Sequence, residues 1–239
     1  QPGVSHYGGT DMMQFLIAAP RSGSGKTTVT CAVLTALQRR GADPCAFKCG
    51  PDYIDPMFHR SALGVESHNL DLYLSAPDTV CTLYARYAAG HGAAVCEGAM
   101  GFYDGLGGVS DTASAWHLAD TLGLPVLLVV QPKGASVTLA AQIQGLVNFR
   151  KNSHVSGILL NDCAPHLYAL LAPMLERETG LPVLGYLPHL PDAALESRHL
   201  GLKTAGEIAD LQQKISQMAD ALVVDWEKLF ALTEGAAPL

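Results

Sequence analysis

One short segment constrains the fold of this chain more than any other. The residues Gly25–Thr28, which read Gly-Lys-Thr-Thr, follow the apolar run Phe15–Ile17 and precede an amphipathic stretch from Val29 to Leu37. A strand, a glycine-rich turn and a helix, in that order, form the setting of a phosphate-binding loop. Glycine lets backbone N–H groups converge on an anion, and the helix N-terminus adds partial positive charge. The segment therefore predicts a nucleotide phosphate site.

The match to the strict pattern G-x-x-x-x-G-K-[ST] is incomplete, because Pro20 stands where the first glycine is expected. Lys26 can still reach the β- and γ-phosphates, and the Thr27 hydroxyl can hold Mg²⁺. The alternative is a strand–helix turn that carries a lysine by chance. The residues expected to bind the nucleotide here are Ser22, Gly23, Ser24, Gly25, Lys26, Thr27 and Thr28.

Apolar strand-like runs alternate with helix-like segments along the chain. The expected strands are residues 14–18, 44–48, 93–97, 125–130, 155–160 and 183–186, and the expected helices are 25–39, 77–89, 114–121, 136–148, 166–177, 204–218 and 225–232. The strands are apolar throughout, as in a sheet covered by helices on both faces. This pattern predicts an α/β fold of the P-loop NTPase type, with a doubly wound, mostly parallel sheet that binds ligands at the carboxyl ends of its strands.

Composition narrows the function classes. The net charge of −7 argues against a nucleic-acid-binding surface, and no apolar run reaches transmembrane length. The six cysteines form no C-x-x-C pair, which favours free thiols in a cytoplasmic protein over disulfides or a zinc site. We expect residues 1–11 to be a remnant of a cloning tag, 12–233 to be one P-loop domain, and 234–239 to be a truncated linker.

The connection at residues 48–60 leaves the second expected strand and is long enough to be a functional loop. It holds Asp52 and Asp55, either of which could approach a P-loop Mg²⁺, since that ion prefers carboxylate oxygens and retained waters. Tyr53 and His59 lie in the same connection. Turn-forming aspartates are the alternative, but this concentration of polar chemistry favours function.

Two later connections carry further candidates. Glu97 ends an apolar strand, as the acid of a Walker B motif does, and is expected to be a Mg²⁺ ligand. Asp104 follows in the same glycine-rich stretch, although it could instead cap the next helix. A late irregular stretch holds Arg198 and His199, and arginine suits bidentate binding of carboxylate or phosphate. Asn161 leaves a late strand and could pair with a base edge, or could be a turn residue.

Four blocks of these residues, in this order, resemble the N-terminal ATP-binding domain of the cobyrinic acid a,c-diamide synthase family, which is related to dethiobiotin synthetase. The blocks are residues 19–28, 47–56, 97–105 and 198–202, and the similarity spans nearly the whole chain after Met12. The resemblance implies ATP-dependent amidation of the a and c acetate carboxylates of a corrin ring through an acyl phosphate, in cobalamin biosynthesis.

The resemblance also implies roles for individual positions. Thr27, Asp52 and Glu97 would hold Mg²⁺, and Asn161 would face adenine. The implied catalytic residues are Lys26, Asp52, Asp55, Glu97 and Asp104, and the implied substrate contacts are Tyr53, His59, Tyr103, Arg198 and His199. The loops around Tyr53 and Tyr103 would close over the substrate.

Enzymes of this family carry a C-terminal glutaminase domain with a catalytic cysteine in a glycine-flanked turn. None of the six cysteines has that context, so we expect the glutaminase to be a separate chain or a missing domain toward which residues 234–239 lead. Hydrogenobyrinate or nickel sirohydrochlorin is the alternative substrate. A partition-type switch ATPase is a less favoured reading, because Arg21 stands where those proteins have a second lysine. The expected partners are the corrinoid, the glutaminase and, in a homodimer, a second copy, but no nucleic acid or membrane.

Overall fold

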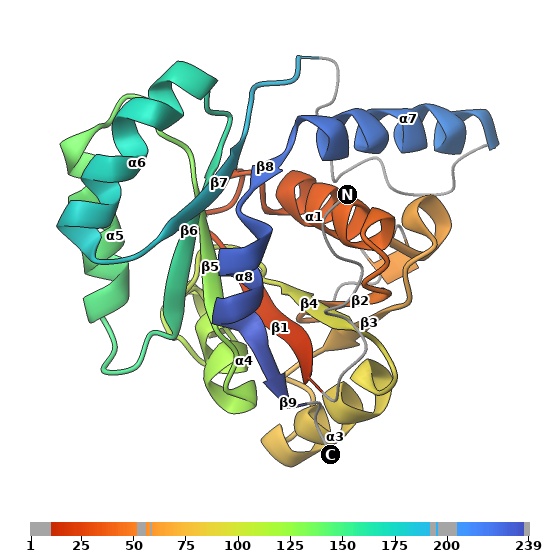
Figure 1. The fold of residues 1–239 in the computed structure, drawn as a ribbon. Helices are drawn as coiled ribbons and strands as arrows, with labels where there is room; N and C mark the ends of the chain where they lie inside the picture. The colour runs from red at the N-terminus through yellow and green to blue at the C-terminus, as the bar shows by residue number, and fades with distance from the viewer. Residues whose placement is uncertain (1–10, 52–55, 58, 192–194, 196–204, 237–239) are drawn as a thin grey trace.

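A single sheet forms the centre of the computed structural model, which describes residues 11–51, 56–57, 59–191, 195 and 205–236 (Figure 1). Its strands lie in the order β3-β2-β4-β1-β5-β6-β7-β8, and β9 pairs with β1 outside this path. The strands are β1 (Asp11–Ala18), β2 (Pro44–Cys49), β3 (Ser67–Leu70), β4 (Ala93–Glu97), β5 (Val126–Val130), β6 (Val155–Asn161), β7 (Val183–Leu187), β8 (Val223–Val224) and β9 (Glu234–Ala236).

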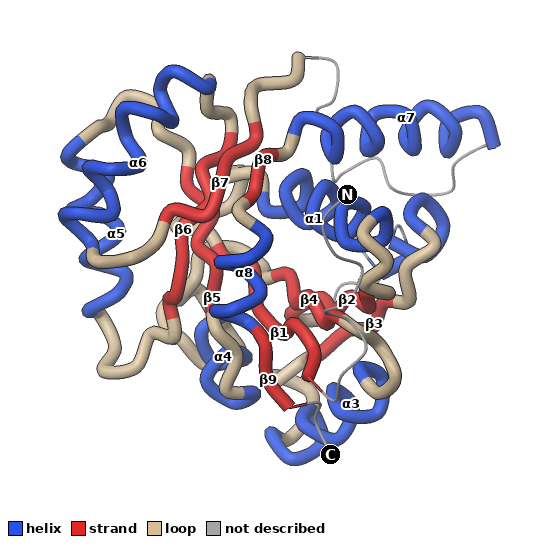
Figure 2. Tube along the Cα trace, in the orientation of Figure 1, coloured by secondary structure: helices blue, strands red, loops and turns tan. Residues whose placement is uncertain are grey.

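Helices connect these strands and cover both faces of the sheet (Figure 2). They are α1 (Lys26–Arg39), α3 (Pro77–Ala88), α4 (Ala115–Leu122), α5 (Val137–Asn148), α6 (Pro165–Thr179), α7 (Ala205–Ala221) and α8 (Trp226–Thr233), with short turns η1 (His59–Leu63) and η2 (Leu106–Gly108). The pairs from β3 to β7 are all parallel, whereas β8 and β9 pair antiparallel. The predicted doubly wound, mostly parallel fold is confirmed.

Successive residues of β1 show why the strands are apolar throughout. Phe15 and Ile17 point into a core with α1 and α8, while Leu16 and Ala18 point into a second core with α3, α4, α5 and α6. All four residues are fully buried. Because both faces are covered, each strand needs apolar side chains in both directions. Helix α7 packs outside α1 through residues such as Ile215 and Met218.

The two ends of the described chain depart from the expectation for residues 1–11 and 234–239. Asp11 is already part of β1, and residues 234–236 form β9 instead of a free linker, with Asp11 opposite Ala236. The physical reason is that β5 pairs with β1 only from Leu16 onward, so one side of the first residues of β1 is available for pairing with β9. The first residues of β1 would otherwise leave backbone hydrogen-bonding groups without partners.

No helix in the described ranges combines the length and the apolar character that a membrane span requires. All six cysteines are free thiols, and five of them are buried.

The edge of the sheet at β7 and β8 offers a test of the packing. A Cβ added to Gly185 would lie 1.9 Å from the Val223 carbonyl oxygen, so Gly185→Ala must push β8 away from β7. We expect the free energy of unfolding to fall by about 1–3 kcal/mol in a urea titration. The matched control is Gly145→Ala in α5, where the added Cβ meets nothing within 4 Å. That variant should gain about 0.5–1 kcal/mol, and equal effects of the two variants would contradict the packing described.

Candidate nucleotide and substrate site

The loop between β1 and α1 has the backbone that an anion site requires. Gly23 and Gly25 have φ angles of 78° and 91°, in the left-handed region that glycine favours. Ser24 Oγ donates a hydrogen bond to the Arg21 carbonyl at 2.9 Å, and α1 begins at Lys26. The first N–H groups of α1 have no partner within the helix and face the loop. The predicted phosphate-binding geometry therefore rests on this turn and on the N-terminus of α1.

Asn161, at the end of β6, is hydrogen-bonded to the phosphate-binding loop. Its Nδ2 donates to the Ser24 carbonyl at 3.1 Å, and the residue is 7% exposed. A Cβ on Gly25 would lie 1.9 Å from this Nδ2, so only glycine fits between the loop and β6. One N–H of the Asn161 amide is thus used by the loop, which leaves its second N–H and its amide oxygen as the groups that could meet a base.

Lys26 reaches across to the loop that follows β4. Its Nζ donates to the Met100 carbonyl at 2.7 Å, and Met100 has a positive φ of 55°. Burial lowers the pKa of Lys26, and the nearby charge of Lys48 lowers it further, while Glu97 and Asp104 act in the opposite direction. The lysine is 8% exposed, so these neighbouring charges, and not bulk water, form most of its surroundings.

A buried ion pair joins β2 to β4 beside this lysine. Lys48 and Glu97 are register partners, their Nζ and Oε2 atoms are in direct contact, and Nζ lies 3.3 Å from the Gly98 carbonyl. The side chains are 7% and 0% exposed. The sequence prediction did not include Lys48. Its signal was a lysine inside an otherwise apolar strand, which needs a partner when both faces of the sheet are covered.

The loop after β4 follows the phosphate-binding loop closely. Gly98 N donates to Ile17 O at 2.8 Å, and Phe102 N donates to Ala19 O at 2.9 Å. A Cβ on Gly101 would lie 2.8 Å from the Pro20 carbonyl, which explains the glycine there. Asp104 turns back on the loop, where its Oδ2 accepts a hydrogen bond from Gly101 N at 3.0 Å and does not cap the following helix.

Two cavities meet this region. The first, of about 360 Å³, runs from Gly23 and Lys26–Thr28 to the ends of β6 and β7, and includes Asn161. The second, of about 550 Å³, is largely apolar. Its lining residues include Cys49, Asp71, Tyr73, Met100, Asp104 and Leu106. Lys26 lines the first cavity, and its hydrogen-bond partner Met100 lines the second, so these two residues stand between them.

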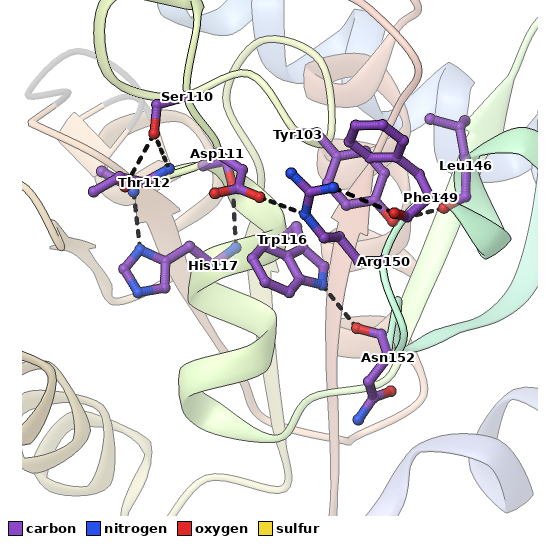
Figure 3. Close-up of polar contacts among 12 residues, drawn as sticks. Tyr103, Ser110, Asp111, Thr112, Trp116, His117, Leu146, Phe149, Arg150 and Asn152 are labelled. Atoms are coloured by element: carbon purple, nitrogen blue, oxygen red, sulfur yellow. Dashed lines mark hydrogen bonds and ion pairs between the residues drawn. The ribbon is translucent and has the colours of Figure 1, made fainter.

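Tyr103 does not face the second cavity. Its hydroxyl donates to the Leu146 carbonyl at 2.6 Å, and its ring packs edge-on against Phe149 at 5.0 Å between centroids (Figure 3). Arg150 covers Phe149 and donates from Nε to Asp111 at 2.7 Å. Tyr103 therefore anchors the loop after β4 to the end of α5 and borders a separate groove beside the phosphate-binding loop.

His59 is a correction to the predicted substrate contacts. It lies in η1, is 0% exposed, and its Nδ1 lies 3.0 Å from Ser67 Oγ. A side chain with no exposed surface cannot contact a substrate in this conformation. The remaining predicted residues of these loops, Asp52, Tyr53, Asp55, Arg198 and His199, lie outside the described residues.

The donor set suits one kind of metal ion. Within the described ranges, no three His, Cys, Asp or Glu side chains are grouped so as to hold a metal. Thr27 and Glu97 offer one hydroxyl and one carboxylate, and the carboxylate already neutralises Lys48. These residues fit an ion that keeps most of its ligands as phosphate oxygens and waters, which is the usual coordination of Mg²⁺ beside a nucleotide.

A glycine turn at a helix N-terminus, a buried lysine and a cavity running to the ends of β6 and β7 together define a P-loop nucleotide-binding domain. The chain belongs to the CobQ/CobB/MinD/ParA nucleotide-binding domain family, whose model matches residues 15–202.

Curated relatives refine this placement. The chain is 42% identical over 223 residues to a cobyrinate a,c-diamide synthase of Clostridium tetani, covering 92% of this chain and 50% of that protein. It is 44% identical over 213 residues to a hydrogenobyrinate a,c-diamide synthase of Brucella ovis, covering 88% of this chain and 48% of that protein. The chain thus spans about half the length of these relatives.

Solved structures agree on the fold alone. A ParA family ATPase from Chlorobium tepidum matches with a TM-score of 0.54 at 17% identity, over 87% of this chain and 98% of that one. Chloroplast FtsY from Physcomitrella patens matches with a TM-score of 0.55 at 13% identity, over 90% of this chain and 69% of that one.

The buried Lys48–Glu97 pair should matter more to the free energy of unfolding than an exposed ion pair does. Lys48→Met removes the ammonium group that contacts the buried Glu97 carboxylate, and we expect it to lower the free energy of unfolding by about 3–5 kcal/mol. The double variant Lys48→Met/Glu97→Leu should be less destabilised than Lys48→Met alone. The control is Arg39→Met, which breaks the exposed pair with Asp220 at 2.7 Å and should cost less than about 1 kcal/mol. A double variant as unstable as the sum of its two single changes would contradict this account.

Proposed function

We propose that this chain is the ATP-dependent amidoligase domain of a corrinoid a,c-diamide synthase, with cobyrinate or its cobalt-free counterpart hydrogenobyrinate as substrate. The observation that carries the proposal is the hydrogen bond between Lys26 and Met100, because Lys26 lines a cavity beside the phosphate-binding loop and Met100 lines a cavity with apolar walls. The names of the relatives at 42% and 44% identity support this choice of substrate.

The chemistry follows from the poor leaving group of a carboxylate. Transfer of the γ-phosphoryl group of ATP to a corrinoid acetate oxygen forms an acyl phosphate and ADP, and ammonia then displaces phosphate to leave the amide. Two anions must meet for the first step. We assign Lys26 and the N–H groups at the start of α1 to the phosphates, and Lys48 to the incoming carboxylate. Lys26 begins the helix that follows β1 and Lys48 lies near the carboxyl end of β2, and these two strands flank β4.

The implied metal fits the same end of the sheet. Thr27 and Glu97 would hold Mg²⁺ together with Asp52, and the ion would neutralise phosphate charge during transfer. Glu97 already contacts Lys48, so its carboxylate would have to contact Lys48 and Mg²⁺ at the same time. Asp104 borders the apolar cavity, where it would orient the substrate. The apolar walls formed by Met100 and Leu106 would exclude water from the acyl phosphate.

Nitrogen is proposed to come from glutamine through a glutaminase that this chain does not itself provide. A glutaminase cysteine must be a thiolate to attack. Burial raises the pKa of Cys49 to about 11 and that of Cys45 to about 12, and raises the pKa of Cys96 well above its usual value. These thiols are therefore poor nucleophiles at neutral pH.

Acyl-phosphate formation can be tested without the glutaminase, because hydroxylamine attacks an acyl phosphate to give a hydroxamate and inorganic phosphate. With ATP, Mg²⁺ and cobyrinate or hydrogenobyrinate, the wild-type chain should form a corrinoid hydroxamate detectable by mass spectrometry. Lys26→Ala should reduce this rate by about 100-fold or more, since it removes a cation from the developing charge.

The matched control is Lys151→Ala, which removes an exposed lysine beyond the end of α5 and should leave the rate unchanged. Thermal melting of both variants shows whether the fold is intact, because Lys26 is largely buried. A folded Lys26→Ala protein with normal hydroxamate formation would rule out the assignment, and ATP turnover that ignores both corrinoids would favour a switch ATPase.

The nitrogen source gives a second test. With ATP, Mg²⁺ and the corrinoid, this chain should form amide slowly from ammonium salts, and the rate should rise from neutral to alkaline pH as more ammonia is unprotonated. Glutamine should not replace ammonium, and no glutamate should be released from it. ATP-dependent release of glutamate in proportion to amide formed would contradict this prediction, because it would show that a thiol of this chain acts as the glutaminase nucleophile.

A further inference from the structure

One wall of the apolar cavity is a loop that is hydrogen-bonded to a histidine outside the predicted site. Ala113 lines that cavity, and its backbone N–H donates to His117 Nδ1 at 2.9 Å. Figure 3 shows the His117 side chain pointing toward the turn that contains Ser110 and Thr112. Because a backbone N–H can only donate, Nδ1 is the acceptor, and the neutral imidazole carries its proton on Nε2. His117 thus supplies an uncharged acceptor to the cavity wall.

The backbone conformation of Ala113 explains why this contact matters. Its φ is 63°, in the left-handed region that residues other than glycine, asparagine and aspartate rarely adopt. A residue stays there only when its surroundings determine the conformation. The imidazole is not needed to begin α4, because Ser114 Oγ caps that helix by accepting from the backbone N–H of His117 at 3.1 Å. The backbone of His117 therefore completes the cap, and its side chain holds Ala113.

The position of Ala113 affects two further residues of the cavity wall. The carbonyl oxygen of Thr112, which precedes Ala113, accepts from Leu106 N at 2.9 Å. A Cβ on Gly105 would lie 2.1 Å from the same oxygen, so the two halves of the loop are in direct contact. Gly105 and Leu106 both line the apolar cavity. A shift of Ala113 therefore moves this wall.

Other contacts hold other parts of the same loop. Asp111 forms an ion pair with Arg150 at 2.7 Å, which ties the turn to the segment that follows α5. Asp104 is held at the beginning of the loop, where its Oδ2 accepts from Gly101 N at 3.0 Å. His117 therefore acts on the cavity wall, and the position of Asp104 depends on a separate contact.

We propose that His117 is a positioning residue for the corrinoid. Its Nδ1 holds Ala113, and through Ala113 the wall at Gly105 and Leu106, in the position at which the apolar cavity accepts the macrocycle. The inference rests on the proposed function, because it takes this cavity as the corrinoid site. Loss of the acceptor weakens corrinoid binding. It leaves ATP binding unchanged, because the phosphates are assigned to the loop between β1 and α1.

The test compares two substitutions at this position in the full chain. In His117→Asn, the amide oxygen Oδ1 takes the place of Nδ1, because both atoms are bonded to Cγ, so the acceptor for Ala113 N is kept. His117→Leu is of similar size and has no acceptor. Equilibrium dialysis against cobyrinate, quantified by its visible absorption, gives the dissociation constants. We expect His117→Leu to raise the constant by about tenfold and His117→Asn to stay within about twofold of the wild type.

Hydroxamate formation gives a second readout. In His117→Leu the KM for cobyrinate should rise while kcat is unchanged, because the wall contributes to binding and Asp104 is held separately. A merely structural role in α4 predicts the opposite order of the two variants, since leucine favours a helix more than asparagine does. Thermal melting shows whether each variant is folded. If His117→Leu does not fold, His117→Ala, which also lacks the acceptor and favours the helix, takes its place.

The matched control is His154→Leu, which removes another half-buried imidazole, 2.8 Å from Asp120, just before the first residue of β6. It should leave corrinoid binding unchanged. A folded His117→Leu protein that binds cobyrinate like the wild type would overturn the proposal, as would a His117→Asn protein that binds it as weakly as His117→Leu. A wild-type chain that binds neither cobyrinate nor hydrogenobyrinate would overturn the proposed function itself, so the two failures are told apart by the wild-type measurement.

Discussion

The contact between Lys48 and Glu97 is the interaction on which the rest of the candidate site depends. Two charges are taken out of water between β2 and β4, each at a cost of several kcal/mol, and their close contact offsets much of that cost. The same charges set the electrostatic surroundings of Lys26, because Lys48 lowers its pKa and Glu97 raises it. A buried cation can be kept beside the phosphate-binding loop only while this balance holds. The pair thus couples the register of two central strands to the charge state of the nucleotide site.

The loop after β4 connects the Lys48–Glu97 pair to Lys26 and to the end of α5. It holds Glu97 at its beginning, the Met100 carbonyl that receives Lys26, and Tyr103, whose hydroxyl is bound to the end of α5. Its backbone also bonds to β1 and to the start of the phosphate-binding loop. One segment therefore contacts Lys26 of the nucleotide cavity, lines the apolar cavity and is bonded to the helix layer.

The sequence was sufficient for the elements whose physics is local or repetitive. Buried parallel strands read as unbroken apolar runs, and the glycines around Lys26 mark a turn that few other folds require. It was insufficient where tertiary contacts decide. β3 reads Ser-His-Asn-Leu and was not predicted, because its pairing with β2 and not its own composition makes it a strand. Tyr103 was expected at the substrate from the family resemblance and His59 from its place in a polar connection, yet packing against Phe149 and Ser67 determines where they point. Lys48 was overlooked because a lone lysine in a strand reveals nothing of its partner on another strand.

The pairing of β9 with β1 has a consequence for how this domain can be rearranged. Asp11 and Ala236 are neighbours in an antiparallel ladder, and such partners lie about 5 Å apart. A linker of a few residues is enough to join them, so the order of elements in the chain is not what holds the sheet together. A circularly permuted form, opened at an exposed turn, would keep every strand neighbour of the present one. The new ends could then be placed beside the nucleotide cavity, where a fluorescent reporter would respond to occupation of the site.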